Sequence, residues 1–265
     1  MPTRLVSSSS AAARLTAARE HIGAHASAEV LIVASSRAAA DELAAEIAFE
    51  RGGLFGVARA GFVELITRLA LPALAKAGLS PTGGLGAEAV ATRVAFEAKS
   101  GALTYFSPVA GMPGFPRAAA RTLDELQQAA VNRELLAHVE DVGSDLATLL
   151  ERVEHEHARS ATVTRAALIG AAARSLESAR LPHLVLLDVA VGSKAERDVL
   201  HALVSSSESL FATAPTGDAR TLAVWKELGF EPSSLPAPPA LPALPARLRL
   251  QQNLFSAELP AAGFA

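Results

Sequence analysis

The sequence contains no cysteine among its 265 residues, and aromatic and charged residues are scarce as well. The absence of cysteine excludes disulfides, thiolate metal sites and cysteine nucleophiles, and it is compatible with a reducing compartment. Aromatic residues make up 5% of the chain and charged residues 19%, whereas 50% is hydrophobic. So large an apolar fraction predicts a sizeable buried core and excludes extensive disorder.

A long uncharged hydrophobic run is also lacking. No stretch of about 18 apolar residues is present, which excludes a membrane-spanning helix, and the N-terminus has no segment of signal-peptide character. We therefore expect a cytoplasmic protein without a membrane partner. The formal net charge of −3 provides no overall attraction to nucleic acid, although local basic patches can still bind phosphates.

Five segments have the composition of β-strands. The clearest are EVLIVAS at residues 29–35 and LVLLD at residues 184–188, because apolar runs with polar ends are typical of buried parallel strands. The other three lie at 4–8, 55–58 and 209–214, and helical patterns occupy 10–26, 37–51, 61–77 and 195–204. This alternation predicts an α/β fold with a mostly parallel sheet flanked by helices.

The chain also divides by composition. GLSPTGGLG at residues 78–86 is a strong break, the following sequence to about residue 178 is almost wholly helical, and residues 232–245 are rich in proline and alanine. The expected divisions are a first half of the α/β domain at 1–86, a helical insertion at 87–180, a second half at 181–231, and a linker with the start of a further region at 232–265.

The turn after the first expected strand is where a nucleotide-binding α/β protein places its phosphate loop. Such a loop needs glycines for close approach of backbone N–H groups, a lysine for the β- and γ-phosphates, and Ser or Thr for Mg²⁺. This turn has neither glycine nor lysine, and consists of Ser7, Ser8, Ser9 and Ser10, followed by Arg14. We predict a degenerate nucleotide site, whose helix N-terminus can still attract an anion, although Ser10 is more simply a helix cap.

Two acids after later strands belong to the same predicted site. Asp188 ends the LVLLD strand, the position of a Mg²⁺-coordinating acid in P-loop enzymes, but Val189 stands where a helicase has its second acid. Glu196 lies further along and is expected to be too distant. Asp218 ends the segment TAPTGD, where superfamily 1 helicases sense nucleotide, although Gly-Asp is also an ordinary turn.

Three further patterns do not indicate a catalytic or metal site. His155 and His157 are two residues apart, so they point in different directions on a helix, and we expect 154–157 to lie on an exposed helix. Serine is abundant, but no Gly-x-Ser-x-Gly elbow is present. The aromatic residues are too scattered for a base-stacking platform and are expected in the core, namely Phe62, Phe96, Tyr105, Phe106 and Phe115. We expect no catalytic residue, no metal and no cofactor.

Taken in order along the chain, several segments resemble a known family. The similarity is closest in SSRAAADELA (35–44), GFVELITRLA (61–70), PGFPRAAARTLDELQQA (113–129), LLDVAVGSKAE (186–196) and ATAPTGD (212–218), and it extends to LQQNLF (250–255). The chain resembles the N-terminal, superfamily 1 (UvrD-like) helicase-like part of the AddB-like, RecB-type exonuclease family of PD-(D/E)XK nucleases. The resemblance implies a P-loop-NTPase-like fold with a helical insertion.

The resemblance also implies a function and partners. It implies repair of DNA double-strand breaks, with a C-terminal nuclease domain that this chain does not match, or with a partner helicase subunit. By the same resemblance, single-stranded DNA would contact Ser35, Ser36 and Arg37 after the second strand, and Arg59 and Phe62 in the next segment. Capping and core roles are an equally simple account of these five residues.

Three functions remain open at this point. The first is a non-catalytic helicase-like module that acts as a scaffold or as a guide for single-stranded DNA. The second is a weak ATP-binding or ATPase domain of the same family, which would depend on Arg14 for its cation. The third is an unrelated small-molecule α/β enzyme with Asp188, Asp218 and Ser35 as its polar candidates, none of which has an obvious base or nucleophile partner. Whether the chain is an enzyme therefore stays open, although full-length members of the family are exonucleases or helicase-like hydrolases.

Overall fold

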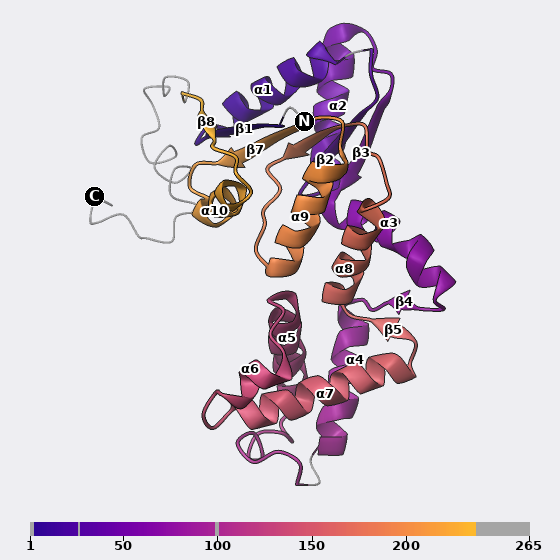
Figure 1. Ribbon diagram of the computed structural model, residues 1–265, viewed down its shortest axis with the longest axis vertical. Coiled ribbons are helices and arrows are strands. Elements are labelled where there is room, and N and C mark those ends of the chain that lie inside the picture. The colour runs from indigo at the N-terminus through magenta and orange to yellow at the C-terminus, as the bar shows by residue number, and fades with distance from the viewer. Residues whose placement is uncertain (1–2, 26, 99–100, 237–265) are drawn as a thin grey trace, which may run out of the picture. The chain divides into compact units, whose positions relative to one another are not determined.

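The computed structural model describes residues 3–25, 27–98 and 101–236, which form two compact units (Figure 1). The first unit comprises Met1–Ile66, Leu176–Gly192 and Leu200–Ala265, and the second comprises Thr67–Ser175 and Ser193–Val199. Helices α3 (Phe62–Lys76) and α9 (Lys194–Ser206) contribute residues to both units. No helix in the described ranges is long and apolar enough to cross a membrane.

The first unit contains a six-stranded sheet in which neighbouring strands are parallel (Figure 1). The strands follow the order β3-β2-β6-β7-β1-β8 across the sheet. Their bounds are β1 Thr3–Ser8, β2 Val30–Ala34, β3 Val57–Gly61, β6 His183–Leu187, β7 Leu210–Pro215 and β8 Ser233–Ser234. The predicted α/β fold with a parallel sheet flanked by helices is confirmed, and it is consistent with a P-loop-like fold.

The central strands are apolar because helices cover both faces of the sheet. In Figure 1, α1 (Ala11–Ala24) and α10 (Ala219–Glu227) lie on opposite sides of it. The register places Ile32 opposite Val185 and Val185 opposite Phe211, and all three are fully buried in one cluster with Leu43 and Ile47. Burial of each such side chain contributes about 2 kcal/mol, so this cluster fixes α2 (Arg37–Arg51) on the sheet.

Side-chain caps set the first residues of α1 and α2. The hydroxyl of Ser10 accepts a hydrogen bond from the N–H of Ala13 at 3.3 Å, and the hydroxyl of Ser36 accepts one from Ala39 at the same distance. Helix α2 ends at Gly52, whose φ of 74° is accessible to glycine without strain. The helix predicted at 37–51 and the capping role of Ser10 are confirmed.

The first unit differs from the sequence expectations in three local features. The third strand begins at Val57, because Gly56 turns the chain with φ 71° and its carbonyl accepts from Val30 N–H, leaving Phe55 88% exposed outside the strand. The segment expected as a linker from residue 232 begins with β8, which pairs with β1. Helix α10 was not predicted, since its nine residues are too few for a clear apolar period. Residues 237–265, which include the rest of that linker and LQQNLF, lie outside the described residues.

The second unit is largely helical. Its core joins buried residues of α4, α5, α6 and α7, including Val94, Leu123, Leu136 and Leu149. Its elements are β4 Ser80–Pro81, α4 Gly84–Ala98, α5 Phe115–Gln128, α6 Arg133–Ala137, α7 Gly143–Arg159, β5 Thr162–Val163 and α8 Arg165–Leu176. The unit begins at residue 67, before the boundary expected at 87, because β4 pairs with β5 and so joins the Gly/Pro-rich segment to the helical block.

Two expectations about side chains in this unit were also wrong. Phe96 and Tyr105 are 75% and 55% exposed and do not belong to the core. Conversely, Glu156 and His157 are buried at the C-terminal end of α7. His157 Nδ1 lies 2.8 Å from the hydroxyl of Thr162, and burial lowers the pKa of this imidazole. The turn into β5 therefore buries a helix end that the sequence pattern suggested was exposed.

A buried carboxylate organises the loop between α4 and α5. Asp145 is 3% exposed and accepts hydrogen bonds from the backbone N–H groups of Thr104, at 3.0 Å, and Phe106, at 2.8 Å. Phe106 in turn packs at the edge of the helical core together with Phe115. Hydrogen bonds to a charged acceptor are among the stronger ones, so Asp145 ties this loop to α7.

We predict that Asp145→Ala lowers the free energy of unfolding of the second unit by about 3 kcal/mol, because it leaves the backbone N–H groups of Thr104 and Phe106 without their charged acceptor. Urea unfolding followed by circular dichroism, together with amide exchange of residues 101–114, measures the effect. Glu140→Gln is the matched control, since Glu140 is an exposed acid in the same region and its change should be nearly neutral. Equal stability of the two variants would contradict the assigned role of Asp145.

Candidate functional site

The candidate site lies at the carboxyl ends of β1, β6 and β7. Ser8 is the last residue of β1, Asp188 directly follows β6, and Thr213 lies near the end of β7. The connection from β1 runs past β7 toward β2, and the connection from β7 runs past β1 toward β8, so these two adjacent strands send their connections in opposite directions. Open α/β sheets bind ligands at the carboxyl ends of strands where the direction of the connections reverses, which makes this edge the candidate functional site.

Arg14 fills this edge from the first turn of α1. Its side chain is 7% exposed, and each of its three guanidinium nitrogens has an acceptor. Nε donates to Asp188 Oδ1 at 2.9 Å, Nη2 donates to Asp188 Oδ2 at 2.9 Å, and Nη1 donates to the carbonyl of Ser8 at 2.5 Å. This bidentate arrangement matches the planar fork of arginine to the carboxylate and is stronger than a single contact.

Asp188 is held in place by its backbone as well as by its charge. Its φ of 49° is unusual for a residue other than glycine and carries a local conformational cost. The hydroxyl of Thr213 donates to Asp188 Oδ1 at 2.7 Å and accepts from the backbone N–H of Asp188 at 3.1 Å. The ion pair and this hydroxyl together determine a conformation that the chain would otherwise disfavour.

Three of the four serines in the predicted serine turn are buried or use their hydroxyls within the turn. Ser7 and Ser8 are buried, whereas Ser9 and Ser10 are half-buried. Ser8 uses its hydroxyl to accept from Ser10 N–H at 3.1 Å, and Ser10 uses its own to cap α1. The Arg14–Asp188 pair is neutral as a whole, so this edge offers little net positive charge to an incoming phosphate.

Asp218 has a separate role from Arg14 and Asp188. It precedes α10, and its carboxylate accepts from Thr221 N–H at 3.0 Å as a helix cap. The hydroxyl of Thr221 in turn accepts from Val191 N–H at 3.0 Å, which anchors the segment after β6. Among the residues of the predicted degenerate nucleotide site, the structure thus brings together Ser8, Arg14 and Asp188. Glu196 is engaged with Arg165 at 3.2 Å in the second unit.

The residues expected to contact DNA lie at the carboxyl ends of β2 and β3. Ser35 is exposed, Ser36 caps α2, and Phe62 is 5% exposed at the start of α3. A phenylalanine buried to this degree cannot stack on a base without a change in its packing. The capping account therefore fits Ser36 and the core account fits Phe62, while a DNA contact at these positions stays a prediction.

Arg37 and Arg59 already face carboxylates. Arg37 Nε lies 3.0 Å from Asp41, and Arg37 Nη1 lies 3.1 Å from Glu64. Arg59 lies 3.5 Å from the same Asp41. The hydrogen bond that Arg37 donates to Asp41 is the largest influence on the pKa of Arg37 and raises it, with charge attraction from Asp41 and Glu64 adding to the effect. Two guanidinium groups and two carboxylates thus form an exposed network whose charges balance.

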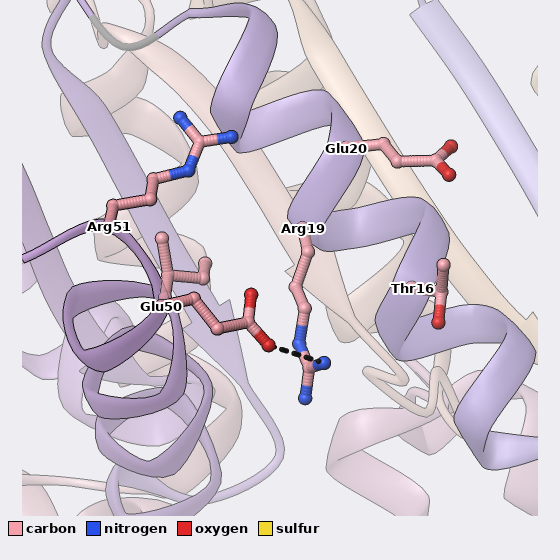
Figure 2. A pocket seen from close by; sticks show the side chains of 6 residues that line it. Thr16, Arg19, Glu20, Glu50 and Arg51 are labelled. Carbon is pink, nitrogen blue, oxygen red and sulfur yellow. Dashed lines mark hydrogen bonds and ion pairs between the residues drawn. The ribbon is translucent and has the colours of Figure 1, made fainter.

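A separate open depression lies between α1 and α2 (Figure 2). It has a volume of about 260 Å³ and is lined by Thr16, Arg19, Glu20, Ile47, Glu50 and Arg51. Arg19 pairs with Glu50 at 3.2 Å, as Figure 2 shows, and also with Glu46. The depression lies along the two helices, away from the strand ends. The charge of Arg19 is balanced by Glu46 and Glu50 of α2, so the depression adds no residue to the candidate site.

Sequence reasoning identified Arg14 and Asp188 separately but did not pair them. They are 174 positions apart, and no local pattern connects positions at that separation. Thr213, Asp41 and Glu64 were missed as members of these networks. Only the Arg37–Asp41 contact could have been predicted from the sequence, since arginine and aspartate four residues apart meet on one face of a helix.

We predict that Arg14→Ala lowers the free energy of unfolding of the first unit by about 3 kcal/mol, because it leaves the Asp188 carboxylate without its partner. Trp225 is the only tryptophan, is buried in the first unit and therefore reports its unfolding by fluorescence. Arg37→Ala is the control, since that guanidinium pairs at the surface and its loss should change stability little. Wild-type stability of Arg14→Ala would show that the pair does not support the fold.

Arg14→Lys should fall between Arg14→Ala and the wild type in the same measurement. Lysine keeps the positive charge but lacks the planar fork that contacts both Asp188 oxygens and the Ser8 carbonyl.

No protein-family model matches this chain, and no curated protein matches it. Its function is therefore inferred from the chemistry and geometry of its own residues.

Proposed function

We propose that this chain is a non-catalytic, helicase-like module of a DNA double-strand-break repair helicase–nuclease, and that it acts as a scaffold. The proposal rests on its resemblance to the AddB-like, RecB-type family and on the occupation of its would-be phosphate site by Arg14. A parallel sheet with a polar network at its strand ends supports the motor-like part of the proposal. The partner would be a helicase subunit or a nuclease domain, and the compartment would be the cytoplasm.

The single observation that supports loss of nucleotide turnover is the Arg14–Asp188 pair. A P-loop enzyme needs its acid free for Mg²⁺ and its cation free for phosphate. In this chain the Asp188 carboxylate and the Arg14 guanidinium are instead bonded to each other. If releasing the pair costs about 3 kcal/mol, it weakens phosphate binding by roughly a hundredfold. The paired Arg14, the paired Asp188 and the turn without glycine therefore all favour a module that has a motor-like fold but does not hydrolyse nucleotide.

Scaffolding is favoured over guiding of single-stranded DNA by the balanced charges on the expected DNA face. Arg37 and Arg59 would have to exchange Asp41 and Glu64 for phosphates before they could bind a DNA backbone. Nucleic-acid affinity depends largely on cations that are available to phosphates. A guide role remains the second form of the proposal and is separated from the scaffold role by a binding measurement.

We predict that millimolar ATP with Mg²⁺ leaves the melting temperature of the wild-type chain unchanged, because a ligand stabilises a protein only when it binds the native state. The measurement is a thermal melt followed by Trp225 fluorescence, with and without nucleotide. Magnesium alone and ATP alone are the controls. A saturable rise in melting temperature with ATP and Mg²⁺ would contradict the proposal and favour the weak ATP-binding alternative.

The DNA form of the proposal is tested by titrating a fluorescent oligothymidine with the chain at low salt. The scaffold role predicts no saturable binding, whereas the guide role predicts binding that falls steeply with salt. In the guide case, Arg37→Ala with Arg59→Ala should weaken binding. Arg121→Ala, at an 84% exposed arginine outside this network, is the matched control and should not change it. Binding that neither variant changes would exclude the predicted DNA face.

A further inference from the structure

Three histidine side chains gather at the end of the first unit that is opposite the Arg14–Asp188 pair. His21 and His25 lie at the C-terminal end of α1, and His183 is the first residue of β6. We call His21, His25 and His183 the histidine cluster. The amino-terminal ends of parallel strands lie at the edge of the sheet away from the candidate site, so the cluster is separate from it.

The rings of the cluster are in direct contact. The centroids of His21 and His25 are 4.4 Å apart, and those of His25 and His183 are also 4.4 Å apart. His21 then stacks on Phe211 of β7 with centroids 4.6 Å apart and planes 17° from parallel. Four rings therefore form one continuous row that joins α1 to β6 and β7, and this row lies beside Ile22, which packs the same end of α1 into the core.

The charged groups around this row are mostly positive. Arg4 of β1 lies over Phe211, 5.8 Å from the ring centroid, and Arg51 of α2 approaches the carbonyl of Gly23 at 3.5 Å. Within the described residues, the carboxylate that lies against the cluster is that of Glu208, 3.6 Å from His183 Nε2 and 67% exposed. A single exposed acid screens additional positive charge in the row poorly.

The hydrogen bonds of the cluster are also satisfied unequally. His183 Nδ1 lies 2.7 Å from the hydroxyl of Ser209, and His25 Nδ1 lies 2.9 Å from the carbonyl of His21. His21 Nε2, by contrast, is buried and has no hydrogen-bond partner within the described residues. Burial is the largest influence on His21 and, with the nearby His25, Arg4 and His183, lowers its pKa to about 4.

The consequence for stability follows from the direction of this shift. An unfolded chain takes up a proton on histidine near pH 6.5, whereas folded His21 does so only near its lowered pKa of about 4. Between these values the unfolded state binds more protons than the folded state, so stability falls as the pH is lowered through this window. Protonation of His21 costs the least free energy in a locally open state, in which the end of α1 separates from the sheet and the rings are exposed to water.

We propose that the histidine cluster is an acid-sensitive contact that holds the C-terminal half of α1 on the sheet while the His21 imidazole is neutral and releases it when His21 becomes protonated. Burial of a charged His21, together with repulsion from the nearby Arg4, opposes the closed arrangement. The N-terminal end of α1 is joined to the sheet separately, through the ion pair of Arg14 with Asp188. The opening is therefore local to one end of one helix.

Amide exchange of the whole chain between pH 7.5 and 5.5, corrected for the intrinsic pH dependence of exchange, tests the proposal. Exchange in peptides covering residues 17–25 should accelerate by roughly tenfold on acidification. At pH 5.5, about one pH unit below the ordinary histidine pKa, preferential protonation of the open state makes opening about ten times more favourable. Peptides covering β2 and the first turn of α1 should change much less. Uniform acceleration over the whole first unit would overturn the proposal, since it would indicate global unfolding instead.

His21→Leu is the decisive variant, because leucine keeps an apolar side chain against Phe211 and cannot be protonated. It should reduce the acid-induced acceleration to below about threefold while preserving protection at pH 7.5.

His25→Gln is the second variant if His21→Leu does not fold, and it should also reduce the acid-induced acceleration. His201→Gln, at an exposed histidine of α9, is the matched control and should behave as the wild type. Wild-type pH dependence in both cluster variants would overturn the proposal.

Discussion

The ion pair between Arg14 and Asp188 is the interaction on which the first unit most depends. It joins α1 to the end of β6, and through the Ser8 carbonyl and the Thr213 hydroxyl it also reaches β1 and β7. A charge buried without a partner would cost several kcal/mol, so neither residue is tolerable here without the other. The bidentate geometry and the two added hydrogen bonds offset the cost of removing these groups from water and support the unusual backbone of Asp188.

The same pair means that, although these strand ends have the topology of a ligand site, the Arg14 guanidinium and the Asp188 carboxylate are already engaged with each other. In a nucleotide-binding enzyme the polar atoms of this edge are satisfied by phosphate and metal; in this chain they satisfy each other. A similar internal balance occurs at the ends of β2 and β3, where Arg37 and Arg59 face Asp41 and Glu64. The difference is the exposure of the arginines, since Arg37 and Arg59 are each 43% exposed and can exchange partners with solvent, whereas Arg14 is 7% exposed.

Helix α1 connects two opposite electrostatic situations. At its first turn a buried cation has its counter-charge in ideal geometry, whereas at its last turn three imidazoles contact each other with one exposed acid beside them. The first arrangement joins opposite charges, whereas the second contains a buried imidazole, His21, whose surroundings disfavour its protonation. One helix can thus be firmly attached at one end and conditionally attached at the other.

The sequence alone determined the elements whose signals are local. The apolar runs predicted β2 and β6, and the Ser10 and Ser36 caps with the Gly52 stop predicted where α1 and α2 lie, because capping and burial depend on neighbouring residues. Only the tertiary structure decided that β8 pairs with β1 and that Arg14 meets Asp188. These facts depend on strand order and on contacts between residues far apart in the chain, and the pairing of two charges 174 positions apart has no local signal.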